Sequence, residues 1–131
     1  MWQATFHAAR AGEMLGAGIN LMAGVGNQSQ HGESYLVWQK GDTVQVMETV
    51  TNTPALTLRA SFPTAHLTAG ETHAYAAYYD PGTGTLAVER DGQPLGTWTD
   101  PTPLLSGSYL ALRTRFSEAS FDSITVERGS R

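Results

Sequence analysis

The sequence of 131 residues contains no cysteine. This absence excludes disulfide bridges, thiolate zinc sites and cysteine nucleophiles, while it leaves the redox compartment undecided. A chain of this length is expected to form a single domain over 1–131 and to bury roughly two-thirds of its unfolded surface. Its stability must therefore come from a hydrophobic core rather than from covalent cross-links.

Positive charge is also scarce. Eight Lys and Arg residues stand against twelve Asp and Glu residues, which gives a formal net charge of −4. The basic residues are not gathered into the stripe that a phosphate backbone requires. The sequence therefore argues against nucleic acid as a partner.

Long apolar runs are missing as well. The longest fall far short of the roughly 20 residues that a membrane helix needs, so no membrane span is expected. The first residues, Met1-Trp2-Gln3, lack the basic and apolar regions of a signal peptide. A mature secreted protein whose leader had been removed would look the same, so the location stays open.

What the chain does contain is an alternation of apolar and polar residues, as in Trp2, Ala4 and Phe6 of the first segment. This period of two is typical of half-buried strands. Only the segment 8–15 has helical character, and Gly12 limits it to one or two turns. Ten short strands separated by turn residues predict an all-β sandwich or barrel. The predicted strands span 2–8, 17–23, 34–40, 43–51, 55–62, 72–79, 84–90, 94–98, 108–116 and 119–127.

The second half of the chain carries an ordered series of short motifs. Thr83-Gly84-Thr85-Leu86 precedes the hairpin signal Asp91-Gly92, then Leu112-Arg113-Thr114 follows, and Phe121-Asp122 opens a closing strand. Over about 72–127 this order resembles the C-terminal half of concanavalin A-like and laminin-G-like jelly rolls. The resemblance is greatest to bacterial sandwich domains associated with polysaccharide utilisation.

That resemblance implies an antiparallel, two-sheet jelly-roll sandwich that acts as a lectin-like module for a glycan or polysaccharide, in a secreted or periplasmic location. Members of this superfamily usually have additional strands before the segment that matches Trp2–Ala8. Either the chain is a compact version without these N-terminal edge strands, or the open edge is covered by a partner, which would make a homo-oligomer.

In this superfamily one sheet face commonly binds sugar, so residues opposite the core face are candidates. If Leu110 and Leu112 are in the core, then Tyr109, Arg113 and Arg115 share the other face. Tyr can stack on a sugar ring, and Arg can grip a carboxylate or hydroxyls with its two-pronged guanidinium. Cross-strand pairing with acidic residues explains the same row equally well.

Aromatic residues provide further candidates for ligand binding. His73 and Tyr75 share one side of a predicted strand with Tyr79, while Tyr78 falls on the other side. Trp38 offers another sugar-stacking surface. The alternative is ordinary packing, because aromatic residues favour strands and Trp is often buried.

Enzymatic activity is not indicated by any known signature of this fold. The paired carboxylates of laminarinase-like glycoside hydrolases and the Q-[IV]-H strand of jelly-roll alginate lyases are both absent. His31 and Tyr35, with Arg59 as a charge neutraliser, could still imitate the base, acid and neutraliser of a polysaccharide lyase. A polysaccharide lyase or glycoside hydrolase is therefore the first alternative, and a structural or assembly protein the second.

Metal and nucleotide chemistry receive little support. The four histidines are scattered without a ligand spacing, and no phosphate-binding glycine motif occurs. No cofactor is therefore expected. Calcium is the one metal that the superfamily resemblance suggests, with Asp80, Asp100 and Asp122 in loop positions that could provide ligands.

Overall fold

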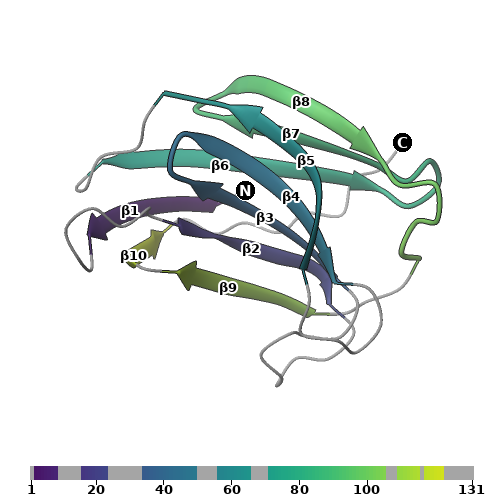
Figure 1. Cartoon of the computed structure of the whole chain (residues 1–131), viewed down its shortest axis with the longest axis horizontal. Helices are drawn as coiled ribbons and strands as arrows, with labels where there is room; N and C mark the ends of the chain where they lie inside the picture. Colours follow the sequence, from purple (N-terminus) through teal and green to yellow (C-terminus); the bar gives the residue numbers. More distant parts are fainter. Residues whose placement is uncertain are drawn as a thin grey trace.

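The computed structural model describes residues 2–8, 16–23, 34–49, 56–65, 71–105, 109–115 and 117–122, and describes side chains over 17–21, 34–49, 56–65 and 71–105. Within this part of the chain there are ten strands and no helix, arranged in two layers (Figure 1). The strands are β1 (Trp2–Ala8), β2 (Gly16–Ala23), β3 (Ser34–Lys40), β4 (Thr43–Thr49), β5 (Leu56–Pro63), β6 (Thr72–Asp80), β7 (Thr85–Arg90), β8 (Gln93–Thr99), β9 (Tyr109–Arg115) and β10 (Ser117–Asp122).

The ten strands match the ten that the alternation predicts. Most boundaries agree within about two residues, because the turn residues between the strands limit where each can end. The last strand begins at Ser117 rather than at 119, and its predicted end at 123–127 lies outside the described residues. Of the predicted helical segment, Ala8 belongs to β1 and 9–15 lies outside the described residues.

The strands form two five-stranded sheets with the orders β10-β1-β6-β7-β8 and β5-β4-β3-β2-β9. Every neighbouring pair is antiparallel. The predicted two-sheet antiparallel sandwich is therefore confirmed. β1 lies between β10 and β6, so it is not an edge strand. In the described part of the chain the sheets end at β10 and β8 and at β5 and β9, and a homo-oligomer that covers such an edge stays a prediction.

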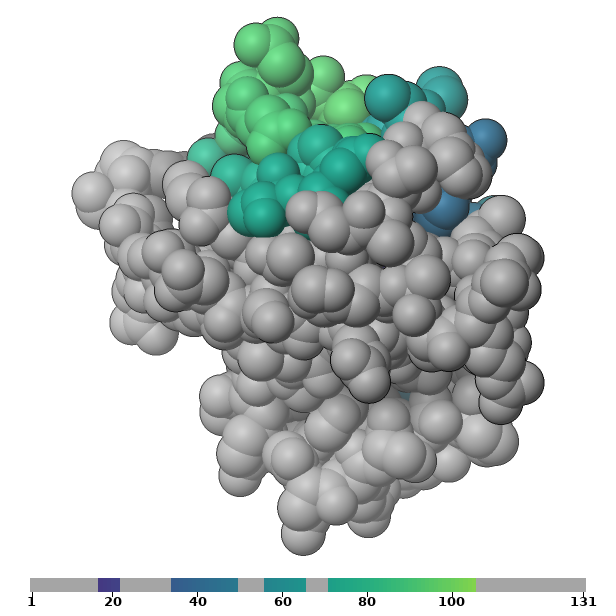
Figure 2. All heavy atoms as spheres, turned by 90° about the vertical axis from the view of Figure 1, so that its left-hand side faces the viewer, coloured from purple at the N-terminus to yellow at the C-terminus, as the bar shows by residue number. Residues whose placement is uncertain are grey.

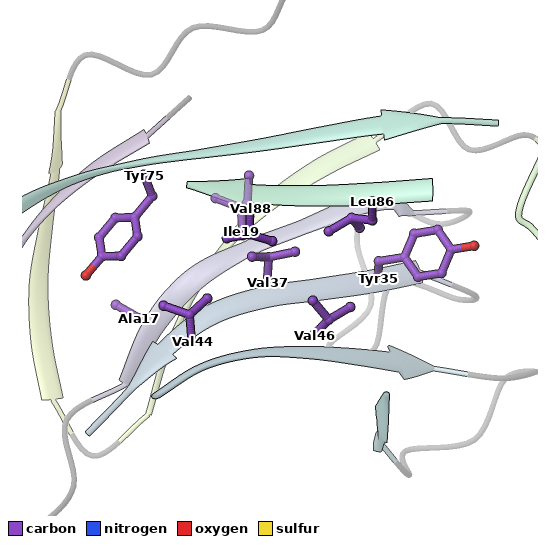
Figure 3. Close-up of a cluster of buried hydrophobic side chains, with 9 residues drawn as sticks. All are labelled: Ala17, Ile19, Tyr35, Val37, Val44, Val46, Tyr75, Leu86 and Val88. Carbon is purple, nitrogen blue, oxygen red and sulfur yellow. The ribbon is translucent and has the colours of Figure 1, made fainter. Parts of the chain in front are cut away.

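The core lies between the two sheets and is built by alternate residues of the strands (Figure 3). Tyr75 stands at one end of this cluster and Tyr35 at the other, with both hydroxyl groups directed away from the aliphatic side chains. The core has an apolar middle and a phenol at each end, and each phenol can reach polar partners there. The cluster comprises Ala17, Ile19, Tyr35, Val37, Val44, Val46, Tyr75, Leu86 and Val88.

Two hairpin turns set the register of the sheets. Gly41, in the turn between β3 and β4, has a φ of 59°. Asp91 and Gly92, between β7 and β8, have φ values of 53° and 78°. Two successive residues with positive φ form the turn that suits the twist of a hairpin. The Asp91-Gly92 hairpin predicted from the sequence is thus confirmed, and it places Arg90 of β7 opposite Gln93 of β8.

Candidate functional site

The row predicted from Tyr109, Arg113 and Arg115 belongs to β9, at one edge of its sheet. Arg113 pairs with Gly18 of the neighbouring strand β2. The side chains of β9 are not among those described, and His31 lies outside the described residues altogether. A glycan-binding role for the β9 residues therefore stays a prediction.

Trp38 of β3 faces away from the core but is not exposed. Only 1% of its surface is accessible, and its neighbour on the same face, Leu36, is fully buried. Its indole Nε1–H donates to Oε1 of Gln45 at 3.1 Å, and the Nζ of Lys40 lies 5.6 Å from the ring centroid. A sugar can stack only on an exposed ring face, so the structure does not support the predicted stacking role of Trp38.

His73 lies in a polar cluster at one end of the sandwich. Its Nδ1 is 2.7 Å from Oδ2 of Asp91, and its Nε2 is 2.6 Å from Oε2 of Glu71. Arg90 is 8% exposed, and its Nη2 lies 2.7 Å from Nε2 of the same His73 ring. Figure 2 faces this end and shows β6 and the β7–β8 turn side by side. The cluster connects the start of β6 to the β7–β8 turn through hydrogen bonds, so it stabilises this end of the fold.

The pKa of Asp91 reflects this cluster. Partial burial of the carboxyl raises its pKa, but the hydrogen bond from the amide of Ala74 and the contact with His73 outweigh that effect, and the net pKa is lowered. The amide donates to Oδ1 at 2.9 Å. Asp91 is therefore held in its charged form, in which it accepts hydrogen bonds from both partners.

Tyr75 belongs to the same end of the sandwich but is 1% exposed. Its hydroxyl donates to Oε1 of Gln39 at 3.1 Å, and burial raises its pKa. Its ring meets His73 edge-on, with centroids 6.3 Å apart. The structure thus brings the predicted pair His73 and Tyr75 together, but as a packed and hydrogen-bonded element without an open ring face.

Tyr35 stands at the opposite end of the core and is 0% exposed. Its hydroxyl donates to Oδ2 of Asp100 at 2.7 Å and accepts from the amide of Leu104 at 3.0 Å. Tyr79 donates to the carbonyl of Leu104 at 2.7 Å. Burial, followed by the contact with Tyr79, raises the pKa of Tyr35 far above its usual value. A phenol that is enclosed and kept protonated in this way does not reach a substrate in solution.

Arg59, the predicted charge neutraliser, has a partner within the protein. Its Nε donates to Oε1 of Glu48 at 2.9 Å. Burial raises the pKa of Glu48, and the nearby Asp100 raises it further, while Arg59 acts in the opposite direction. Tyr35 and Arg59 thus meet in one polar cluster, but this cluster joins β3, β4 and β5 to the segment after β8. Tyr35 and Arg59 are therefore engaged within the protein, while the predicted lyase group as a whole stays a prediction because His31 lies outside the described residues.

The outer face of β6 and β7 is different, because it presents an exposed aromatic ring. Tyr78 is 55% exposed, whereas Tyr75 and Tyr79 on the alternate positions contact the core. Beside Tyr78 lies an open hollow of about 120 Å³, which is formed by β6, β7 and the turn that follows β7. The hollow is lined by Ala74, Tyr75, Ala76, Tyr78, Glu89 and Gly92.

The register explains why this face is hollowed. Ala76 pairs with Glu89, and Tyr78 pairs with Ala87. Small alanine side chains therefore surround one large ring and one carboxylate on the same face of two neighbouring strands. His73 and Tyr75, which the sequence indicates as ligand-binding residues, have the other parity on β6. The shared parity of Ala74, Ala76 and Tyr78, two small residues followed by one large ring, is the signal that could have identified the outer face.

Neither a protein-family profile nor a curated protein sequence matches the chain. Solved structures do match. The carbohydrate binding module CBM66 from Bacillus subtilis has a TM-score of 0.70 at 13% identity, over 92% of this chain and 69% of that one. Sheep galectin-11 in complex with glycerol has a TM-score of 0.61 at 12% identity, over 92% and 88%.

The fold is a concanavalin A-like jelly roll. This confirms the fold that the C-terminal motif order suggested. At 12–13% identity the likeness concerns the fold alone, since the same sandwich can support unrelated functions.

Two of the three aspartates predicted as calcium ligands, Asp80 and Asp100, accept hydrogen bonds from neighbouring residues of their own turns. Oδ1 of Asp80 accepts from the amide of Gly82 at 2.9 Å, and Oδ1 of Asp100 accepts from the amide of Thr102 at 2.9 Å. The side chain of Asp122 is not among those described. Among the described residues no group of three or more His, Asp or Glu could hold a metal ion. Calcium binding stays an untested prediction.

In the described part of the chain, no helix is long and apolar enough to cross a membrane.

Proposed function

We propose that this jelly roll is a carbohydrate-binding, lectin-like module whose ligand lies on the outer face of β6 and β7. The observation that supports this proposal is the exposed ring of Tyr78 beside an open hollow with Glu89 in its wall. Ligand sites are typically concave and mainly apolar, with a few polar groups that fix the orientation of the ligand. The hollow has this composition.

The chemistry of a sugar ring suits these groups. One face of a pyranose presents C–H groups, which pack against an aromatic ring, while the hydroxyls at its rim need hydrogen-bond partners. Tyr78 provides the aromatic surface, and the adjacent Ala76 leaves room for the ring of the ligand. The carboxylate of Glu89 accepts hydrogen bonds from hydroxyl groups, and bonds to a charged acceptor are among the strong ones.

The structural neighbours agree with this proposal. One is named as a carbohydrate binding module, and the other is a galectin in complex with glycerol. Their low identity to this chain gives no residue-level correspondence. The residues of the site are therefore proposed from this chain's own geometry.

Affinity gel electrophoresis against a panel of neutral and acidic polysaccharides tests the proposal. We expect at least one neutral polysaccharide to retard the protein and Tyr78→Ala to weaken that retardation about tenfold, since covering an aromatic face contributes roughly 1–2 kcal/mol. Leu58→Ala is the matched control, because Leu58 is 52% exposed and lies on β5 of the other sheet. Unchanged retardation of Tyr78→Ala, or no retardation of the wild type by any glycan, would contradict the proposal.

A further inference from the structure

The two sheets of the sandwich carry opposite charge. The five strands β10-β1-β6-β7-β8 contain four acidic residues and one basic residue, while β5-β4-β3-β2-β9 contain one acidic residue and four basic ones. The net charge of −4 of the whole chain conceals this division. The face that bears Tyr78 therefore belongs to the acidic sheet.

The charge near the hollow is carried by named groups. Glu89 lines the hollow itself. Asp91, at the adjoining turn, has a side chain that is 50% exposed, but it contacts His73 at 2.7 Å and the Nε of Arg90 at 3.9 Å, so Glu89 is the carboxylate that bears on a ligand in the hollow. Arg90 is the single Lys or Arg in the strands of this sheet. It is 8% exposed, lies on the same side of β7 as the buried Leu86 and Val88, and its Nη2 lies 2.7 Å from Nε2 of His73 at the end of the sandwich. Its charge is directed away from the hollow.

We propose that the hollow beside Tyr78 selects glycans without acidic groups, and that Glu89 sets this selection. The inference rests on the proposed function and narrows it to neutral sugars and amino sugars. It departs from the sequence-based expectation that arginines clasp a carboxylated glycan, because those arginines lie on β9 of the other sheet.

Like-charge repulsion gives the expected size of the effect. Two unit charges about 4 Å apart interact by about 1 kcal/mol in water and by about 4 kcal/mol at the effective dielectric constant of a protein surface. Glu89 is half-buried, so its repulsion of a carboxylated sugar falls between these limits. We expect an acidic version of the ligand to bind at least about fivefold more weakly than the neutral one.

The test compares one glycan in two charge states. The neutral polysaccharide that retards the wild type most strongly is oxidised at its primary hydroxyls to carboxylates, and both forms are titrated against the wild type, Glu89→Gln and Tyr78→Ala. The two forms are also compared at low and high salt, because screening weakens a charge repulsion without restoring a lost hydroxyl contact.

The inference predicts that oxidation weakens binding to the wild type, and that both Glu89→Gln and high salt reduce the difference between the two forms. Oxidised glycan that binds the wild type as well as the neutral form would overturn it. A difference that neither salt nor Glu89→Gln reduces would also overturn it. If no glycan binds, or if Tyr78→Ala binds like the wild type, then the proposed function itself fails.

Discussion

The hydroxyl of Tyr35 holds one end of the sandwich together, and removing it should cost more stability than removing any other phenolic hydroxyl nearby. In Tyr35→Phe, the buried carboxylate of Asp100 loses a donor at 2.7 Å and the amide of Leu104 loses its acceptor at 3.0 Å. Asp100 keeps its bonds from Thr102. The ring stays in place, so the packing of the core changes little.

The magnitude follows from these two losses. A hydrogen bond to a charged group contributes about 1.5–3 kcal/mol, and a buried amide without an acceptor costs about 1–3 kcal/mol. Partial relaxation of the segment around Leu104 should leave a loss of about 3 kcal/mol. At roughly 4 °C per kcal/mol for a domain of this size, Tm falls by about 12 °C. Tyr79→Phe is the matched control, because its hydroxyl donates to the carbonyl of Leu104 and otherwise contacts only the Tyr35 hydroxyl at 3.2 Å among the described residues, so its loss should cost about 1 kcal/mol.

Urea denaturation followed by tryptophan fluorescence, with thermal unfolding by circular dichroism, measures both variants. We expect both to unfold with the slope of the wild type, and only Tyr35→Phe to show a large shift of the midpoint. Equal losses in the two variants would refute the reasoning, as would a loss below about 1 kcal/mol in Tyr35→Phe. Either result would mean that the bonds to Asp100 and Leu104 contribute little to holding this end closed.

Three further predictions concern single residues. Gly18→Ala should lower the free energy of unfolding by about 3 kcal/mol, because a Cβ there would overlap the backbone of Val37. Gly96→Ala should cost less, because its Cβ would meet only the side chain of Phe62, which can move. Similar losses for the two variants in urea denaturation would contradict this. The raised pKa of Glu48 means that the folded protein binds the carboxyl proton more tightly than the unfolded chain does, so the stability falls as the pH rises from about 4.5 through the folded-state pKa. Glu48→Gln should therefore flatten the dependence of Tm on pH above about pH 4.5. An unchanged profile would count against this prediction. The lowered pKa of Asp91 acts in the opposite sense, so its contribution is present above its usual value of 3.8 and is lost as pH falls through its folded pKa. Asp91→Asn should therefore unfold at a lower temperature than the wild type at neutral pH, with a difference that shrinks towards about pH 2; a constant difference would argue against the assigned cause.

The fold could be predicted from the sequence because its signals are local. Alternation marks each strand, and a turn such as Asp91-Gly92 allows two positive φ values that few other residue pairs accept. The order of the strands within each sheet could not be predicted from the alternation, because strands far apart in the sequence, such as β1 and β10, pair with each other. Such pairings depend on the packing of two complete sheets rather than on neighbouring residues.

The candidate site could be predicted only in part. The parity of β6 was correctly assigned, with Tyr75 and Tyr78 on opposite sides, but parity alone does not say which side is covered. The same limit applies to Trp38, which faces away from the core and is nevertheless 1% exposed. Burial depends on what lies over a sheet face, and this is a property of the whole fold.

The opposite charges of the two sheets separate the two glycan hypotheses. The residues Tyr109, Arg113 and Arg115 belong to the edge strand of the basic sheet, and Tyr78 and Glu89 belong to the acidic one. A carboxylated glycan would be repelled by the acidic face and attracted by the basic one. If Arg113→Ala no longer retains an acidic polysaccharide and Tyr78→Ala still does, that ligand binds at β9. If Tyr78→Ala no longer retains a neutral polysaccharide and Arg113→Ala still does, the neutral ligand binds in the hollow. Because the two sites lie in different sheets, each set of variants is the control for the other.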